Sequence, residues 1–136
     1  MTKSRFLLAA CAIALAAGSA QAEMPQSFGI LEFGPDATLF VADSVGATIH
    51  AYTLPSDGAA PAEEAAINLL DVDALLSEAL GADARIVYSD LAVHPLTRDA
   101  YVSLMTSVDG SEMGAVASIS REGNVEILDL ASLPST

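Results

Sequence analysis

Two histidines and a set of carboxylates are the side chains of this chain that could carry out acid–base chemistry. His94 precedes Pro95 at the expected junction of a strand and a turn, and Asp90 is the nearest acid along the sequence. A catalytic histidine needs an orienting partner within hydrogen-bond reach. If residues 90–94 form a strand, the side chains of Asp90 and His94 share a face but stand roughly 13 Å apart. We therefore expect His94 to be a polar turn residue, and His50 to lie on the surface of a strand.

A nucleophilic serine has little support in the sequence. Ser44 lacks the Gly-x-Ser-x-Gly context that places a serine on a sharp turn between a strand and a helix. Asp36 and Asp43 lie in segments of turn composition, where a short acidic side chain bonds to the neighbouring backbone. We expect both to be turn-forming acids.

The remaining acidic pairs are also explained without a ligand. Asp71 and Asp73 lie at an expected helix start, where acids cap the helix and interact with its dipole. Asp109 and Glu112 could contribute oxygens to a calcium ion, but their spacing fits no calcium-binding loop. The sequence thus predicts no catalytic, cofactor-binding or metal-ligating residue, and it leaves the identity of any cofactor open.

The first 22 residues have the composition of a secretory signal peptide. Lys3 and Arg5 give a positive start, residues 6–17 form an apolar run, and residues 20–22 are a small-x-small cleavage site. The run is too short for a membrane anchor, which needs about 20 residues. Cleavage would leave 114 of the 136 residues, beginning at Glu23.

A lipoprotein signal is the alternative reading of this segment. Residues 8–11 resemble a lipoprotein processing site that ends at Cys11, but few apolar residues precede this cysteine and a longer run follows it. A cleaved signal peptide fits better and removes the chain's single cysteine, so the mature chain holds no disulfide and its stability must come from a core. We expect the protein to be periplasmic or secreted.

The mature chain is strongly acidic. All 18 aspartates and glutamates follow residue 22, against three arginines and no lysine, which gives a formal charge of −15. A surface of this kind repels nucleic acid and anionic lipid. We therefore expect no nucleic acid as a partner, and no membrane once the signal is cleaved.

A unit of four short apolar runs occurs twice, about sixty residues apart. The matching segments, in the same order, are 31–35 with 91–95, 39–42 with 100–103, 46–49 with 114–117, and 67–72 with 125–130. A self-similar unit of this kind is typical of repeated four-stranded sheets. The strands expected from turn signals and apolar runs are residues 30–33, 38–42, 47–54, 67–70, 86–93, 100–105, 115–120 and 125–130, with a polar turn over 108–114.

One helix is predicted between the two units. Apolar residues at positions 72, 75, 76, 79 and 80 form a single stripe at helical spacing. Asp71 is a suitable N-cap, and Gly81 is placed to end the helix. We expect this helix, residues 72–80, to pack on one rim of the strands.

The segment from Phe33 to Ser44 resembles a blade of the NHL and gluconolactonase-like six-bladed propellers. Those blades often read Pro-Asp-Gly, then a strand, then Val-Ala-Asp-Ser, and here Ala37 stands where glycine is usual. The segment from Asp90 to Pro95 resembles blade openings of the same class. The likeness covers roughly residues 28–130. In lactonase-like relatives, acidic and amide side chains from several blades hold a metal at the central channel, and two blades could supply only part of such a set.

Together these observations predict an all-β protein of two four-stranded antiparallel propeller-like blades, residues 28–72 and 85–130, with helix 72–80 between them. We expect a non-catalytic binding or scaffold module, or a fragment of a longer propeller. The alternative is a metal-dependent lactonase-like hydrolase, or a remnant of one. Two blades leave two outer faces bare, which predicts a homo-oligomer in which three chains supply six blades. The residues expected to be buried are Phe33, Leu39, Val41 and Ile49 in the first unit, and Val93, Tyr101, Val102 and Ile127 in the second.

Overall fold

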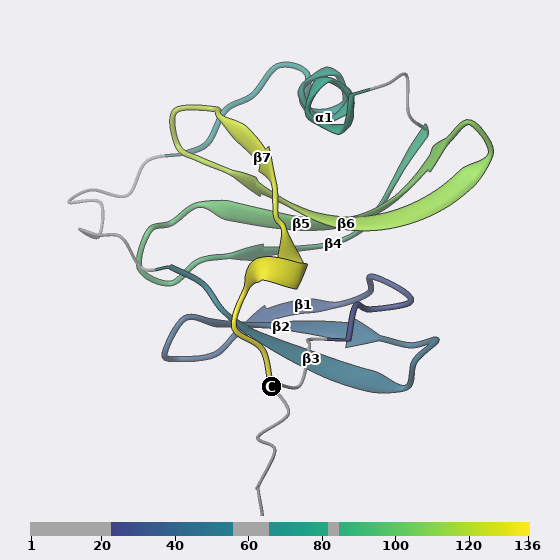
Figure 1. The fold of residues 1–136 in the computed structure, drawn as a ribbon. Helices are drawn as coiled ribbons and strands as arrows, with labels where there is room; N and C mark the ends of the chain where they lie inside the picture. The colour runs from purple at the N-terminus through teal and green to yellow at the C-terminus, as the bar shows by residue number, and fades with distance from the viewer. Residues whose placement is uncertain (1–22, 56–65, 82–84) are drawn as a thin grey trace, which may run out of the picture.

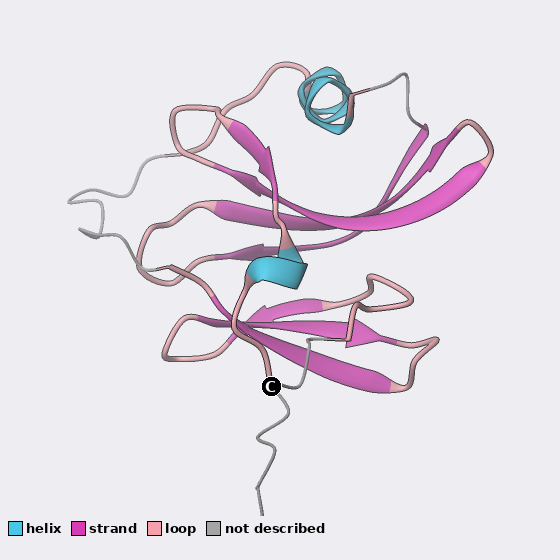
Figure 2. Ribbon diagram, in the orientation of Figure 1, coloured by secondary structure: helices cyan, strands magenta, loops and turns pink. Residues whose placement is uncertain are grey.

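The computed structural model describes residues 23–55, 66–81 and 85–136, and the expected signal peptide lies outside the described residues. The described chain is mostly β-structure with one α-helix (Figure 2). Its elements are β1 (Leu31–Phe33), β2 (Thr38–Asp43), β3 (Thr48–Thr53), α1 (Val72–Leu80), β4 (Arg85–Val93), β5 (Ala100–Val108), β6 (Ser111–Ile119), β7 (Val125–Ile127) and a 3₁₀ turn, η1 (Leu130–Ser132).

These elements form three layers (Figure 1). Strands β1, β2 and β3 make a three-stranded antiparallel sheet, and β4 to β7 make a four-stranded antiparallel sheet in simple sequence order. The four-stranded sheet is the middle layer: the three-stranded sheet lies against one of its faces and α1 lies against the other (Figure 1). The structure therefore has two sheets with a helix between them in sequence, as expected, although one sheet has three strands.

Strand β5 shows how the middle layer is buried on both faces. Val102 and Leu104 point to the helix side, where Leu104 packs with Leu76 of α1. Tyr101 and Met105 point to the other side and pack against the core between the sheets. Apolar residues at successive positions suit a strand with both faces covered, and the run from Ala100 to Val108 has that composition.

The core between the sheets is built around Leu39, Val41 and Tyr52, whose side chains have no exposed surface. The segment before β1 adds Phe28, whose ring lies directly over Gly114 of β6, where a Cβ atom would clash with it. Further members of this cluster are Leu31, Leu54, Val116 and Leu130. Glycine at this position of β6 thus lets the N-terminal segment lie flat on the second sheet.

The helix follows its local sequence signals. The side chain of Asp71 accepts a hydrogen bond from the Ala74 N–H at 2.9 Å, which satisfies one of the free donors of the first turn. Gly81 ends the helix with φ +82°, a left-handed conformation that glycine adopts without strain. The predicted boundaries and both caps are confirmed.

The predicted fourth strand of the first unit is wrong. Residues 66–70 form no strand, and Ile67 and Leu69 instead pack against Ala100, Val102 and Ile119 on the helix side of the middle sheet. The two side chains are partly buried there, and burial of their apolar surface favours this position.

Residues 134–136 pair with the edge of β3 that does not face β2. Tyr52 forms an antiparallel bridge with Ser135. The Thr53 N–H donates to the Pro134 carbonyl at 3.0 Å, and Thr136 exchanges two hydrogen bonds with Ala51, at 3.1 and 3.3 Å. The position expected for strand 67–70 is therefore taken by a segment from the far end of the sequence.

The predicted polar turn over residues 108–114 is shorter in the structure. Strand β5 runs to Val108 and β6 begins at Ser111, so the turn consists of Asp109 and Gly110, with φ of 50° and 79°. Aspartate followed by glycine, both at positive φ, matches the twist of a two-residue hairpin. The last predicted strand is also shorter, because β7 ends at Ile127.

Predicted burial is confirmed for Leu39, Val41 and Val102, while Phe33, Tyr101 and Ile127 are half-buried. The prediction is wrong for Ile49 and Val93, which are 67 % and 49 % exposed. Side chains alternate between the two faces of a strand. Because Tyr52 points inward on β3, the side chain of Ile49, three residues earlier, points outward. Val93 ends the edge strand β4, beyond the cover of α1.

The expectation of two bare outer sheet faces is corrected in part, because one of them is partly covered. Helix α1 and residues 67–69 cover part of the outer face of the four-stranded sheet, which still exposes Tyr88, Leu91 and Val93 of β4 to 45 %, 57 % and 49 %. The outer face of the three-stranded sheet exposes Ile30, Phe40 and Ile49, to 67 %, 36 % and 67 %.

Shortening Leu39 to alanine tests the core between the sheets. Because this side chain is fully buried, we expect Leu39→Ala to lower the free energy of unfolding by about 2–5 kcal/mol. Ile49→Ala, on the neighbouring strand, is the control and should change it by less than about 0.5 kcal/mol. Urea unfolding of dilute protein measures both, and equal losses would contradict the assignment of inner and outer faces.

Candidate functional site

The buried carboxylate of Asp43 holds the chain segment before β1 in place. Its Oδ2 accepts the Gln26 N–H at 2.7 Å, and its Oδ1 accepts the N–H and hydroxyl of Ser27 at 3.0 and 2.8 Å. The N–H groups of Val45 and Gly46, in the turn after β2, donate to Oδ1 at 3.1 and 2.8 Å. Asp43 is therefore a turn-forming acid, as expected, and it also joins this turn to a second segment.

These hydrogen bonds hold the pKa of Asp43 far below its usual range. The Gly46 N–H has the largest effect, the Gln26 N–H and the two Ser27 donors add to it, and burial opposes them. Glycine suits position 46, because a Cβ atom there would clash with the carboxylate of Asp43. All these donors are fixed groups of the fold, so the carboxylate has a structural role.

His50 and Ser44 lie beside Asp43 without forming a catalytic arrangement. The Nε2 of His50 is 3.7 Å from Oδ2 of Asp43, and its ring stacks on Tyr52 with centroids 6.2 Å apart. The side chain of His50 is only 12 % exposed, so the expectation of a surface histidine is wrong. It shares the inward face of β3 with Tyr52. The Ser44 hydroxyl lies 3.3 Å from the Ser27 hydroxyl and contacts no histidine.

His94 is a turn residue, as expected, but it is fully buried, at 1 % exposure. Its Nδ1 accepts the N–H groups of Leu96 and Thr97 at 3.2 and 3.0 Å. Its ring lies edge-on to that of Phe33, with centroids 5.0 Å apart. Burial lowers the pKa of His94, and the charge of Asp99 opposes that shift only in part. A neutral imidazole that accepts two backbone donors stabilises this turn.

Asp90 connects the two sheets and does not orient His94. Its Oδ2 accepts the Leu31 N–H of β1 at 3.0 Å, and its Oδ1 accepts the following N–H, of Leu91, at 2.9 Å. The register of β4 against β5 shifts between Tyr88 and Asp90, which marks a β-bulge at Ser89.

The bulge decides which side chains of β4 face the helix. Tyr88 is paired with Leu104 and Leu91 with Val102, so both point to the helix side although they are three residues apart. In a regular strand, residues at odd separation point to opposite faces. Asp90 is paired with Ser103 and therefore points to the other side, toward β1.

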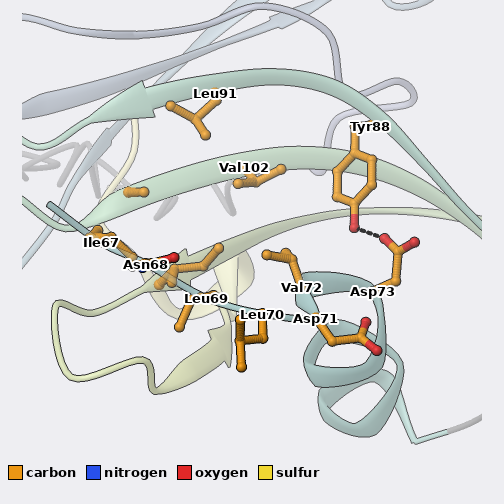
Figure 3. Close-up of a pocket in the computed structure, with 12 residues that line it drawn as sticks. Ile67, Asn68, Leu69, Leu70, Asp71, Val72, Asp73, Tyr88, Leu91 and Val102 are labelled. Atoms are coloured by element: carbon orange, nitrogen blue, oxygen red, sulfur yellow. Dashed lines mark hydrogen bonds between the residues drawn. The ribbon is translucent and has the colours of Figure 1, made fainter.

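A recess of about 680 Å³ opens on the helix side of the middle sheet (Figure 3). Its walls come from three places: residues 67–73, two side chains of β4 and the ends of two inner strands. The residues outside the first segment are Tyr88, Leu91, Ala100, Val102 and Ile119. Most of the lining is apolar, and the polar groups are Asn68, Asp71, Asp73 and the hydroxyl of Tyr88.

One hydrogen-bonded polar pair lies at the helix end of the recess. The Tyr88 hydroxyl donates to the carboxylate of Asp73, and Figure 3 shows the two side chains reaching toward each other from β4 and α1. Burial, the hydrogen bond to Asp73 and the charge of that carboxylate raise the pKa of Tyr88 to about 12. The phenol is therefore a neutral hydrogen-bond donor at physiological pH.

Structural roles were expected for Asp71 and Asp73. Asp71 is confirmed as the N-cap of α1, and Asp73, in the first turn, also accepts the hydrogen bond from Tyr88. No sequence signal pointed to Tyr88 or Leu91 as residues of a site, and residues 67–69 were expected only as part of a strand. Asp36 accepts the Thr38 N–H at 3.3 Å in its turn, as expected. Asp109 and Glu112 are exposed. Within the described residues, no three histidine, cysteine or acidic side chains come together as a metal site. No helix there is long and apolar enough to span a membrane.

The burial of His94 predicts a pH-dependent stability. Because its pKa is lowered in the folded protein, the unfolded chain binds the proton more readily, and the free energy of unfolding should fall as the pH drops through about 6.5. In His94→Asn this fall should be reduced between pH 7.5 and 5, and in His50→Asn it should persist. Thermal unfolding at several pH values measures it. An unchanged dependence in His94→Asn would contradict the assignment.

Comparison with known proteins gave no match: no family model, no curated protein and no solved structure is similar to this chain.

Proposed function

We propose that this chain is an exported, non-catalytic binding module built from two propeller-like blades, and that its ligand site is the recess beside α1. The observation that carries the proposal is the recess itself, in which apolar side chains from residues 67–73, β4 and β5 converge around one hydrogen-bonded polar pair. Ligand sites commonly have this composition, with an apolar lining and a few placed polar groups, and volumes of about 300–1,000 Å³.

A non-catalytic role is supported by what the ionisable side chains contact. Asp43 accepts donors from two chain segments, His94 accepts two backbone N–H groups, and Asp90 bridges β1 and β4. All three side chains are hydrogen-bonded to the backbone, and those of Asp43 and His94 are buried. A general base has to reach a proton of the substrate, so none of the three is placed for that task.

The comparison with propeller blades is supported by two features. Both sheets are meanders, and their first strands, β1 and β4, lie side by side, as the inner strands of neighbouring blades do. The turns after these strands also correspond: Ala37 and Arg98, 61 positions apart, both have positive φ, 62° and 65°. Glycine is usual at this position of the blades that the first unit resembles, and positive φ explains that preference.

Self-association through the bare face of the three-stranded sheet is a further part of the proposal. A ring of three chains would use both outer faces of each chain, and α1 already lies across part of one of them. The outward positions of the bare face are Ile30, Glu32, Thr38, Phe40, Ala42, Ile49, Ala51 and Thr53, with a single acid among them. In residues 23–136, with a formal charge of −15, a face nearly free of acids is the one that a second copy can approach. We therefore propose a dimer with these faces together.

A neutral fluorescent probe tests the recess. We expect N-phenyl-1-naphthylamine to bind saturably, with one site per chain and an increase in fluorescence on entering the apolar lining. Leu91→Ser should weaken binding about five-fold, because it removes an apolar wall. Val87→Ser is the matched control, since Val87 is similarly exposed on β4 but faces away from the recess.

Equal affinities of the two variants would contradict a site at the recess. The alternative function, a metal-dependent lactonase-like hydrolase, would be favoured by stoichiometric Ca²⁺ or Zn²⁺ in the purified protein together with lactone hydrolysis.

Sedimentation of the mature chain tests the dimer. We expect dimers at micromolar concentration, and monomers for Ile49→Asp, because the introduced carboxylate would be buried opposite its own copy. Val87→Asp, a similar change on β4, should still dimerise. A wild-type chain that remains monomeric at about 100 μM would contradict self-association.

A further inference from the structure

We propose that the recess beside α1 selects small amphipathic cations, ligands with an apolar body and a single ammonium group. This inference rests on the proposed function and adds the chemical class of the ligand. It follows from the way apolar and charged groups are distributed over the walls of the recess.

The apolar part of the recess is suited to an alkyl or aryl group. Leu91 and Val102 lie on the floor formed by β4 and β5, and Ile67 and Leu69 lie opposite them on the segment that leads to α1 (Figure 3). The volume of about 680 Å³ is that of a site for a small organic molecule. Burial of an apolar group there supplies affinity without regard to charge.

The charged part of the recess lies at one end and has one sign. Asp71 and Asp73 are the acidic residues of the lining, and among the described residues that line the recess none is basic. Arg85 is the nearest base along β4, but its pairing with Ser107 places it on the opposite face of the strand from Tyr88. A ligand cation at this end meets carboxylates and the aromatic ring of Tyr88, which attracts cations by its π-electrons.

The start of α1 opposes this preference but does not reverse it. A helix N-terminus carries a positive charge of about half an electron. Two carboxylates at that terminus outweigh it, and the Asp71 side chain is already bonded to the Ala74 N–H. The Tyr88 hydroxyl uses its proton on Asp73, so its oxygen can act only as an acceptor toward a further group. An anionic ligand would meet repulsion from both aspartates.

The test compares three probes with the same apolar body: 4-phenylbutylamine, 4-phenylbutan-1-ol and 4-phenylbutanoate. Displacement of N-phenyl-1-naphthylamine from the full mature chain at low ionic strength gives their affinities. We expect the amine to bind about five-fold more tightly than the alcohol, and the carboxylate most weakly. In Asp73→Asn the preference for the amine should fall to about two-fold or less, while the affinity for the alcohol stays unchanged.

Glu112→Gln is the matched control, because it removes one negative charge from β6 outside the lining and should leave the preference intact. Equal affinities of the three probes for the wild-type chain, or a preference that survives in Asp73→Asn, would overturn the cation selectivity and leave the recess as a site for apolar ligands. If neither the three probes nor N-phenyl-1-naphthylamine bind, the proposed function is overturned as well.

Discussion

The β-bulge at Ser89 is the local constraint on which the arrangement of the molecule depends. One extra residue in β4 turns Asp90 toward β1, where its carboxylate accepts the Leu31 N–H and joins the inner edges of the two sheets. The same residue leaves Tyr88 and Leu91 together on the opposite face, where they line the recess. The bulge at Ser89 therefore determines both the contact between the sheets and the shape of the recess. Bulges commonly redirect side chains in this way next to functional sites.

The acidity of the chain also has a structural side. Three aspartates accept backbone N–H groups that would otherwise be unsatisfied. Asp43 does so for the segment before β1, Asp90 for β1 at its sheet edge, and Asp71 for the start of α1. Charge-assisted hydrogen bonds of this type are stronger than neutral ones. A short chain with a single cysteine, which can form no internal disulfide, thus fixes irregular segments by carboxylates, while the bare sheet face stays nearly free of charge.

Local signals in the sequence predicted the local structure well. Helix α1 and its caps follow from Asp71, Gly81 and the apolar stripe between them, and most strands follow from turn residues. The faces of β3 were assigned wrongly, because the large side chain of Tyr52 decides which face is buried and Ile49 then lies outside. The recess could not be predicted. It depends on a bulge with no sequence signature and on the packing of residues 67–69 against a strand thirty positions later.

The pairing of Ser135 with Tyr52 has a consequence for how the chain folds. These residues are 83 positions apart, and the whole four-stranded sheet lies between them in sequence. Closing so long a loop costs entropy that only later contacts repay, and topologies with distant pairings fold slowly. During synthesis the edge of β3 stays without this partner until residues 134–136 have been made. The first sheet therefore reaches its final form only after the four strands of the second sheet have been synthesised.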